Sequence, residues 1–223
     1  MGGAIGETLP FALGVAISPI PIIAVILMLL SPKARATSVG FLLGWLAGIV
    51  IAVTVFTLLS SILPGSDADE SHPIQGVIRL IFGMLLLLLA LRQWRGRPKA
   101  GEEPRMPKWM QAIDKVSFPT ALGLGFLLSA VNPKNLLLTA GAGVDFGSAG
   151  LDAGAVIAVI AVFTLVAAST VLIPVVGYLV AADRLKEPLD ALRVWLAREN
   201  AVIMAVLLLV LGVDLIGKGI AAF

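Results

Sequence analysis

Residues 128–138 read Leu-Ser-Ala-Val-Asn-Pro-Lys-Asn-Leu-Leu-Leu, which places a polar patch, Asn132–Asn135, inside a long apolar run. A proline within a helix removes one backbone hydrogen bond and leaves carbonyl oxygens without partners. In hydrocarbon such oxygens are costly, so irregular backbone persists only where it is buried in protein or lines a watery cavity. The patch therefore predicts a transmembrane helix that is broken within the membrane.

A second proline cluster, Ser18-Pro19-Ile20-Pro21, lies in the first half of the chain. The segments that carry the two clusters open alike, with Pro-Phe-Ala-Leu-Gly at 10–14 and Pro-Thr-Ala-Leu-Gly at 119–123, an offset of 109 residues. Three helices per half would insert the second half upside down, and broken helices at matching positions of inverted repeats indicate a transport site. The alternative is a pair of simple proline kinks.

The composition favours an integral membrane protein. Hydrophobic residues make up 59% of the 223 residues and charged residues 13%, about half the usual charged share. This excludes a disordered chain and disfavours a water-soluble one. The absence of cysteine excludes disulfides, thiolate metal sites and thiol redox chemistry. Apolar stretches of about 20 residues can span a bilayer, and six are present: 8–30, 37–63, 74–91, 118–144, 153–182 and 201–223.

These stretches predict an all-α integral membrane protein with six transmembrane helices arranged as two inverted three-helix repeats. Helices 1 and 4 are the ones that proline breaks. We expect a single transmembrane domain over residues 1–223, with repeat 1 at about 1–95, a cytoplasmic loop at about 96–117 and repeat 2 at about 118–223.

The loop charges divide between two sides. One side has 13 basic residues in its loops, Lys33–Arg35, Arg92–Lys115 and Asp183–Arg198. The other side has acids and no Lys or Arg, in the N-terminus, Pro64–Pro73 and Gly141–Asp152. Because basic loops are cytoplasmic, we predict a multi-pass plasma membrane protein with both termini outside. Topology and contact with anionic lipid account for the basic pI, so no nucleic-acid partner is expected.

Two cytoplasmic stretches look amphipathic. Pro107–Asp114 places Trp109 and Ile113 four residues apart, and Pro188–Leu196 places Leu189, Leu192 and Leu196 on one face beside Trp195. We predict that both are short helices lying in the inner membrane interface. Docking of a partner is the alternative.

Few charged residues lie within the predicted spans. Counting about 1.5 Å per residue puts Lys134 and Asp214 at the same depth, with Arg79 near them and Lys218 close to the outer interface. Intramembrane charges are functional candidates by default. We hypothesise that Lys134, with Asn132, Pro133 and Asn135, lines a site for an anionic or polar group of a cargo. Asp214 is the predicted counter-charge, and Arg79 and the first break (Ser18, Pro19 and Pro21) complete the set. The alternative for Arg79 and Asp214 is snorkelling to the outer interface.

The sequence lacks the residues that metal binding, ATP binding or catalysis would need. The single histidine, His72, lies in an outer loop, and the spans hold no cluster of metal ligands, so neither a metal site nor a cofactor is expected. No P-loop signature for ATP and no nucleophile–base constellation occurs, so the chain is not expected to be an enzyme. The Gly40-x-x-x-Gly44-x-x-x-Gly48 spacing favours close helix packing, either in a homodimer or within the fold, which we prefer.

The chain resembles the GAP family, the glycopeptidolipid- and sulfolipid-addressing proteins of mycobacteria and related actinobacteria, within the lysine exporter (LysE) superfamily. Arg-Gln-Trp-Arg-Gly-Arg-Pro at 92–98 and Met-Pro-Lys-Trp-Met at 106–110 are specific to the GAP group. The Pro-x-Pro break and the Asn-Pro-Lys patch are shared more widely with amino-acid exporters of the superfamily. Further similarity lies at 17–27, 40–45, 123–135 and 207–217.

The resemblance implies export of a cell-envelope glycolipid or related amphipathic molecule across the plasma membrane, alone or as the partner of a larger lipid exporter. One alternative is a small-solute exporter of the amino-acid type, driven by an ion gradient. Many such exporters have Pro-Gly-Pro at the first break, where this chain has Ile20, and the bulkier residue argues against close approach of a small solute. The other alternative is a non-transporting membrane scaffold. A lipid-handling protein predicts a lateral opening between helices, and a small-solute exporter predicts a closed polar pocket around Asn132–Asn135.

Overall fold

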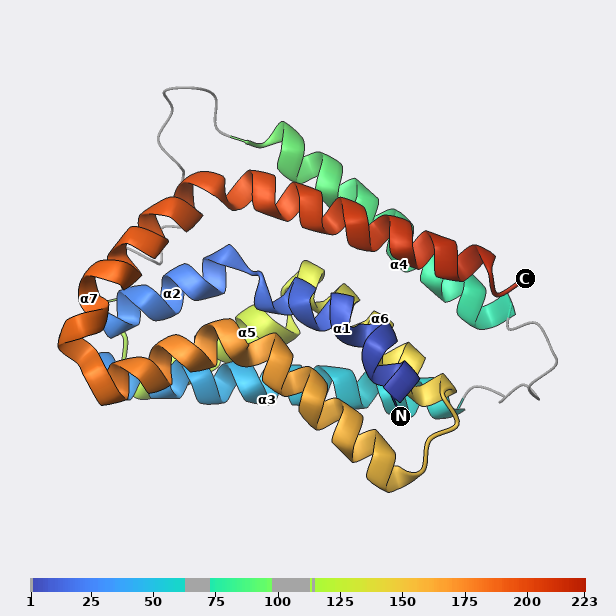
Figure 1. Cartoon of the computed structure of the whole chain (residues 1–223), viewed down its shortest axis with the longest axis horizontal. Coiled ribbons are helices and arrows are strands. Elements are labelled where there is room, and N and C mark those ends of the chain that lie inside the picture. Colours follow the sequence, from blue (N-terminus) through green and yellow to red (C-terminus); the bar gives the residue numbers. More distant parts are fainter. Residues whose placement is uncertain (1, 63–72, 98–112, 114) are drawn as a thin grey trace.

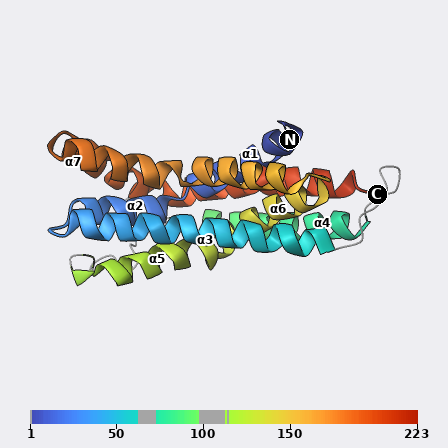
Figure 2. The same cartoon turned by 90° about the horizontal axis from the view of Figure 1, so that it is seen from below.

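The computed structural model describes residues 2–62, 73–97, 113 and 115–223, and every regular element in them is helical. Figures 1 and 2 show a flat, elongated helical bundle. The predictions for the outer-loop residues Asp67, Asp69, Glu70 and His72, and for all of Pro107–Asp114 except the buried Ile113, lie outside the described residues. The helices are α1 (Gly2–Ala16), α2 (Pro19–Leu29), α3 (Ala34–Ile62), α4 (Pro73–Arg95), α5 (Phe118–Ala130), α6 (Pro133–Ser148) and α7 (Ala153–Ile220).

Four helical segments are long and apolar enough to cross a membrane unaided: Ala34–Ser61, Gly76–Arg95, Ala153–Ala182 and Arg184–Ile220. Two further pairs qualify when each is taken as one bent span, α1 with α2 at 52° and α5 with α6 at 61°. The described residues thus hold four to six candidate spans. The predicted breaks in the first and fourth segments are confirmed, because both bends fall at the proline clusters.

The long helix α7 consists of two arms. Ala181 departs from helical geometry, with φ −143° and ψ 52°. Beyond this elbow α7 crosses the end of the bundle and then turns back, so that its first and second arms run in nearly opposite directions (Figure 1). The helix predicted over Pro188–Leu196 is not a short element of its own but part of α7. The stretch is helical, but it continues without interruption into the last candidate span. Leu189 and Leu196, seven residues apart, join the core, whereas Trp195 is 53% exposed.

Glycines allow two helix pairs to approach closely. A methyl group on Gly44 of α3 would overlap the Leu122 carbonyl of α5, and one on Gly125 of α5 would overlap the Phe41 carbonyl of α3. The glycine spacing of α3 therefore serves packing within the fold. In the second pair, Gly83 of α4 lies against Gly212 of α7.

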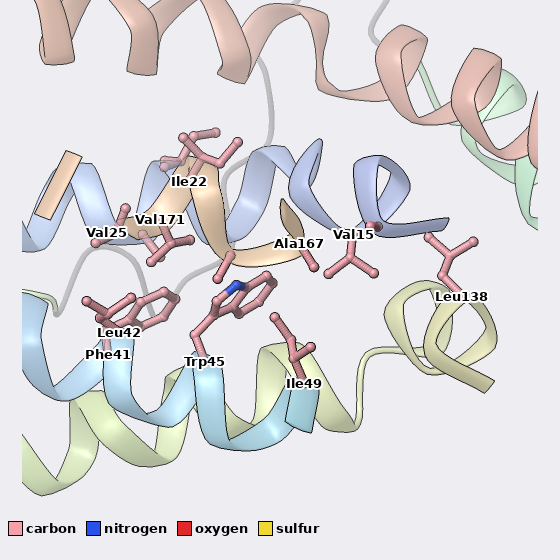
Figure 3. Close-up of a cluster of buried hydrophobic side chains, with 14 of the residues drawn as sticks. Val15, Ile22, Val25, Phe41, Leu42, Trp45, Ile49, Leu138, Ala167 and Val171 are labelled. Carbon is pink, nitrogen blue, oxygen red and sulfur yellow. The ribbon is translucent and has the colours of Figure 1, made fainter. Parts of the chain in front are cut away.

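The apolar core draws on all seven helices, and Figure 3 shows the part of it where α2, α3 and the first arm of α7 meet, flanked by Val15 of α1 and Leu138 of α6. Trp45 of α3 is fully buried there, with its ring centroid 6.2 Å from that of Phe41. Ile22 and Val25 come from α2, and Val171 from α7. Both chain termini lie toward the end of the bundle opposite the α7 elbow and the turn between α2 and α3 (Figure 1).

Candidate functional site

Both helix breaks have the same local construction. The second helix of each pair begins on a proline, Pro19 in α2 and Pro133 in α6, preceded by the N-cap residues Ser18 and Asn132. Proline is well suited to this position because the first-turn N–H groups have no partner within the helix. The side chain of Asn132 accepts a hydrogen bond from the backbone N–H of Lys134 at 3.0 Å, which satisfies one of these donors.

The first break leaves backbone carbonyls at the end of α1 without helical partners. The Ile17 carbonyl lies four residues before Pro21, which has no N–H to donate. The Ala16 carbonyl accepts instead from the Ser18 N–H at 2.9 Å and from the hydroxyl of Thr170, on α7, at 2.6 Å. This end of α1 is rich in acceptors and carries the negative end of the helix dipole.

Lys134, from the second break, supplies donors to the first. Its Nζ donates to the Gly14 carbonyl at 2.7 Å, to the Ile17 carbonyl at 3.4 Å and to the hydroxyl oxygen of Ser18. The lysine is only 8% exposed, and an ammonium has three hydrogens to donate. The end of α1 therefore saturates Lys134, and this offsets the cost of a cation at the positive start of α6.

Asn135 and Ser18 complete this link. The fully buried Asn135 donates through Nδ2 to the Leu128 carbonyl of its own break at 2.9 Å. Its Oδ1 accepts from the Ser18 hydroxyl at 3.1 Å. We call Ser18, Lys134, Asn135 and Thr170 the break cluster. It links the first predicted break (Ser18, Pro19 and Pro21) to the second (Asn132–Asn135) through the bonds of Ser18 to Lys134 and Asn135.

The predicted pairing of Lys134 with Asp214 is wrong. Asp214 pairs instead with Lys218, with Nζ to Oδ2 at 3.3 Å. The Arg79 guanidinium donates to Oδ1 of Asp145, 2.7 Å from Nη2. Lys218 also lies 3.9 Å from the other oxygen of Asp145. Arg79, Asp145, Asp214 and Lys218 thus form a separate charge cluster that joins α4, α6 and α7.

Asp145 is the functional candidate that sequence reasoning missed. It was assigned to an outer loop, yet it lies inside α6 with its side chain 3% exposed. It follows Lys134 by 11 residues, or about 16 Å of helix. The estimate of depth assumed straight helices and ignored the 61° bend between α5 and α6. It therefore put Lys134 too close to Asp214. An acid within the apolar run 136–146 was the available signal. Thr170 was also missed, and no distinctive pattern marks it.

A lateral groove lies between α3 and the first arm of α7, beside the end of α6. Its volume is about 910 Å³. We call it the α3–α7 groove. Ile157 and Leu165 of α7 are 70% and 59% exposed there. Its other lining residues are mostly apolar and include Val50, Thr54, Leu58, Phe146 and Ala161.

These features define a class: a helical multi-pass membrane protein with two broken helices whose breaks are linked by a buried polar cluster, and with an apolar lateral groove between two of its helices. The model of a protein family described as Sap, sulfolipid-1-addressing protein (SfLAP), matches residues 8–221. Because this match covers nearly the whole chain, the protein belongs to that family. Neither a curated protein nor a solved structure matches the chain.

Proposed function

We propose that the protein moves or presents a cell-envelope glycolipid, or a related amphipathic molecule, for export across the plasma membrane. Membership of the sulfolipid-1-addressing family supports this cargo class. The observation that carries the proposal is the α3–α7 groove, which is lined mainly by apolar side chains and opens between candidate spans. An acyl chain can enter such a groove from the bilayer without crossing water, because both environments are apolar.

The arrangement of the break cluster supports a lipid more than a small solute. Lys134 and Asn135 are buried and donate their hydrogen bonds to oxygen atoms of the protein. They therefore line no open polar pocket in this conformation. The amino-acid exporter alternative requires them to exchange these partners for cargo. The scaffold alternative is disfavoured by the α3–α7 groove, since a dry packed bundle needs no lateral opening.

For the mechanism, we propose that two inverted three-helix repeats rock about the paired breaks to give alternating access. Among the described residues α1 packs against α6, whereas α2 and α5 show no comparable packing. By the positive-inside rule, α1 and α6 are the outer halves of their spans and both termini face outward. In this conformation the outer halves of the two broken spans, α1 and α6, therefore pack against each other. Placement within the lysine exporter superfamily is part of the same proposal, as is the role of accessory to a larger lipid exporter.

Lipid and metabolite profiling, inside and outside cells that lack the protein, tests the cargo class. We expect a glycolipid to accumulate inside and to be depleted outside. Re-expression with Ala161→Trp, which fills the α3–α7 groove, should fail to restore export. Ile173→Trp is the matched control, because Ile173 is 69% exposed on the same arm of α7 and lies outside the groove lining. An intracellular excess of amino acids with unchanged lipids would contradict the proposal.

A reversible crosslink tests the rocking mechanism. The chain has no cysteine, so an engineered pair is unique. A methyl group on Gly14 of α1 would lie 2.8 Å from Cδ1 of Leu138 in α6, so Gly14→Cys with Leu138→Cys brings the two Cβ atoms near disulfide distance. We expect oxidation to stop export and reduction to restore it, with the reduced protein as the control. Unimpaired export by the oxidised protein would overturn the mechanism.

A further inference from the structure

A second apolar groove lies between α4 and the second arm of α7. Its lining comprises Leu87, Ala90, Leu91 and Trp94 of α4 and Ala205, Val206 and Leu209 of α7, around a volume of about 520 Å³. We call it the α4–α7 groove. Its walls face outward, since Leu91, Trp94 and Leu209 are 45%, 47% and 51% exposed. It shares no lining residue with the α3–α7 groove.

Glycine contacts explain where this groove begins. A methyl group on Gly83 would lie 2.9 Å from the Gly212 carbonyl, and one on Gly219 would lie 3.0 Å from the Gly76 carbonyl. The pairs run in opposite order along the two helices, so α4 and the second arm of α7 are antiparallel. Beyond Gly83, α4 carries Leu87, Leu91 and Trp94 in place of glycine, and these larger side chains line the groove.

The end of this groove near Trp94 is surrounded by arginines. The guanidinium of Arg97 lies 3.9 Å above the ring centroid of Trp94. Arg95 follows Leu91 by four residues and therefore continues the same helix face. On α7, Arg198 precedes Ala205 by seven residues, a spacing that puts both residues on one face of a helix. Because the helices are antiparallel, Arg198 reaches the same end as Arg95. All three arginines are exposed.

We propose that the α4–α7 groove is a binding site for a resident anionic glycerophospholipid, distinct from the exported cargo. One acyl chain fills the apolar groove, and the phosphate lies among Arg95, Arg97 and Arg198. Guanidinium groups bind phosphate oxygens through paired hydrogen bonds. Trp94 sits where tryptophan is favoured, between hydrocarbon and headgroups. Basic pockets between transmembrane helices on the cytoplasmic side are general anionic-lipid sites, and these arginines belong to the loops that the positive-inside rule assigns there.

Charge complementarity distinguishes this occupant from others. A zwitterionic lipid fills the groove equally well but does not use the three cations. A helix from a second copy of this chain would need acidic residues at the arginines. No ion pair within the described part of the chain involves Arg95 or Arg198. The proposal does not depend on the identity of the exported cargo.

Native mass spectrometry of the full chain in nonionic detergent tests the proposal. The probe is an equimolar mixture of phosphatidylglycerol and phosphatidylcholine with identical acyl chains. We expect phosphatidylglycerol to be retained at least tenfold better. A charge near the membrane surface contributes about 1 kcal/mol, or roughly fivefold, so Arg95→Gln with Arg198→Gln should remove most of this preference. Val206→Trp, which fills the groove from a half-exposed position, should lower retention of both lipids.

Two matched controls keep the result specific. Lys33→Gln with Arg35→Gln removes two exposed cations, one in the turn before α3 and one in the first turn of α3, and should leave retention unchanged. Val210→Phe enlarges a 60% exposed residue of the same α7 arm outside the groove and should also have no effect. Equal retention of the two lipids would overturn the proposal. So would an equal loss in the control variants, or a lipid-free dimer.

Discussion

The two helix breaks are alike in geometry and opposite in chemistry. Both bend their spans strongly, by 52° and 61°, and both restart the helix on a proline. The first break offers oxygens, the carbonyls of Gly14 and Ile17 and the hydroxyl of Ser18. The second offers N–H donors from Lys134. Each break in isolation would leave polar groups unsatisfied in an apolar interior. Together they satisfy each other, so the pair is better described as one joint than as two kinks.

Loss of Lys134 should have the largest effect on this joint. Lys134→Met keeps the length of the side chain and removes its donors, so the buried Gly14 carbonyl and the part-buried Ile17 carbonyl lose partners, at about 1–3 kcal/mol for a buried group. Release from burying a charge offsets part of this cost. We expect the free energy of unfolding in detergent to fall by about 2–4 kcal/mol, and export to be lost. Lys33→Met, at an exposed lysine, is the control. An unchanged or raised stability would show that Lys134 does not hold the breaks together.

Loss of Asn135 should have the second-largest effect on stability, because its side chain is hydrogen-bonded to both breaks. Asn135→Leu preserves volume but leaves the Leu128 carbonyl and the Ser18 hydroxyl short of a partner. We expect a loss of about 2 kcal/mol in unfolding free energy, again measured in detergent. The control is Asn200→Leu, since the Asn200 Oδ1 is buried without a partner, and its removal should be neutral or stabilising. Equal losses at the two positions would assign the effect to packing and not to the hydrogen bonds.

A smaller effect is expected at Thr170. Thr170→Val removes one of two hydrogen bonds to the Ala16 carbonyl and leaves that from the Ser18 N–H in place. The expected cost is about 1 kcal/mol, read from the same unfolding measurement. Thr164→Val on the same arm of α7 is the control, because the Thr164 hydroxyl makes no hydrogen bond that the substitution could remove. A cost above that of Asn135→Leu would contradict the ranking.

Pro133 should matter least. It lies in the first turn of α6, where a missing N–H costs nothing and other residues are accepted. Pro133→Ala is therefore expected to change the unfolding free energy by less than about 0.5 kcal/mol, within the range of neutral substitutions. The bend itself should persist, which distance measurements between spin labels on α5 and α6 can check. A straightened span would show that the proline, and not the polar joint, sets the bend.

The sequence predicted the all-helical membrane class, the two breaks and the residues of both breaks, because proline and glycine act locally and long apolar runs have few other uses. The predictions that failed concern side chains whose interaction partners lie in distant segments of the chain. Lys134 was matched to Asp214 by counting depth along straight helices, and the bend at Asn132–Pro133 invalidates that count. Asp145 directly follows the uncharged run that ends at Val144, so the sequence predicts a loop there. Arg79 and Lys218 are its partners, and only the packing of α4 and α7 against α6 reveals them.

A double-mutant cycle on Lys134→Met and Ser18→Ala tests the joint most directly. The two side chains come from different breaks and are hydrogen-bonded to each other, so their effects on stability should not add. The four unfolding free energies, measured in the same detergent, should give a coupling energy of at least about 1 kcal/mol. Effects that add to within about 0.5 kcal/mol would show that the breaks are independent kinks, and would contradict the account.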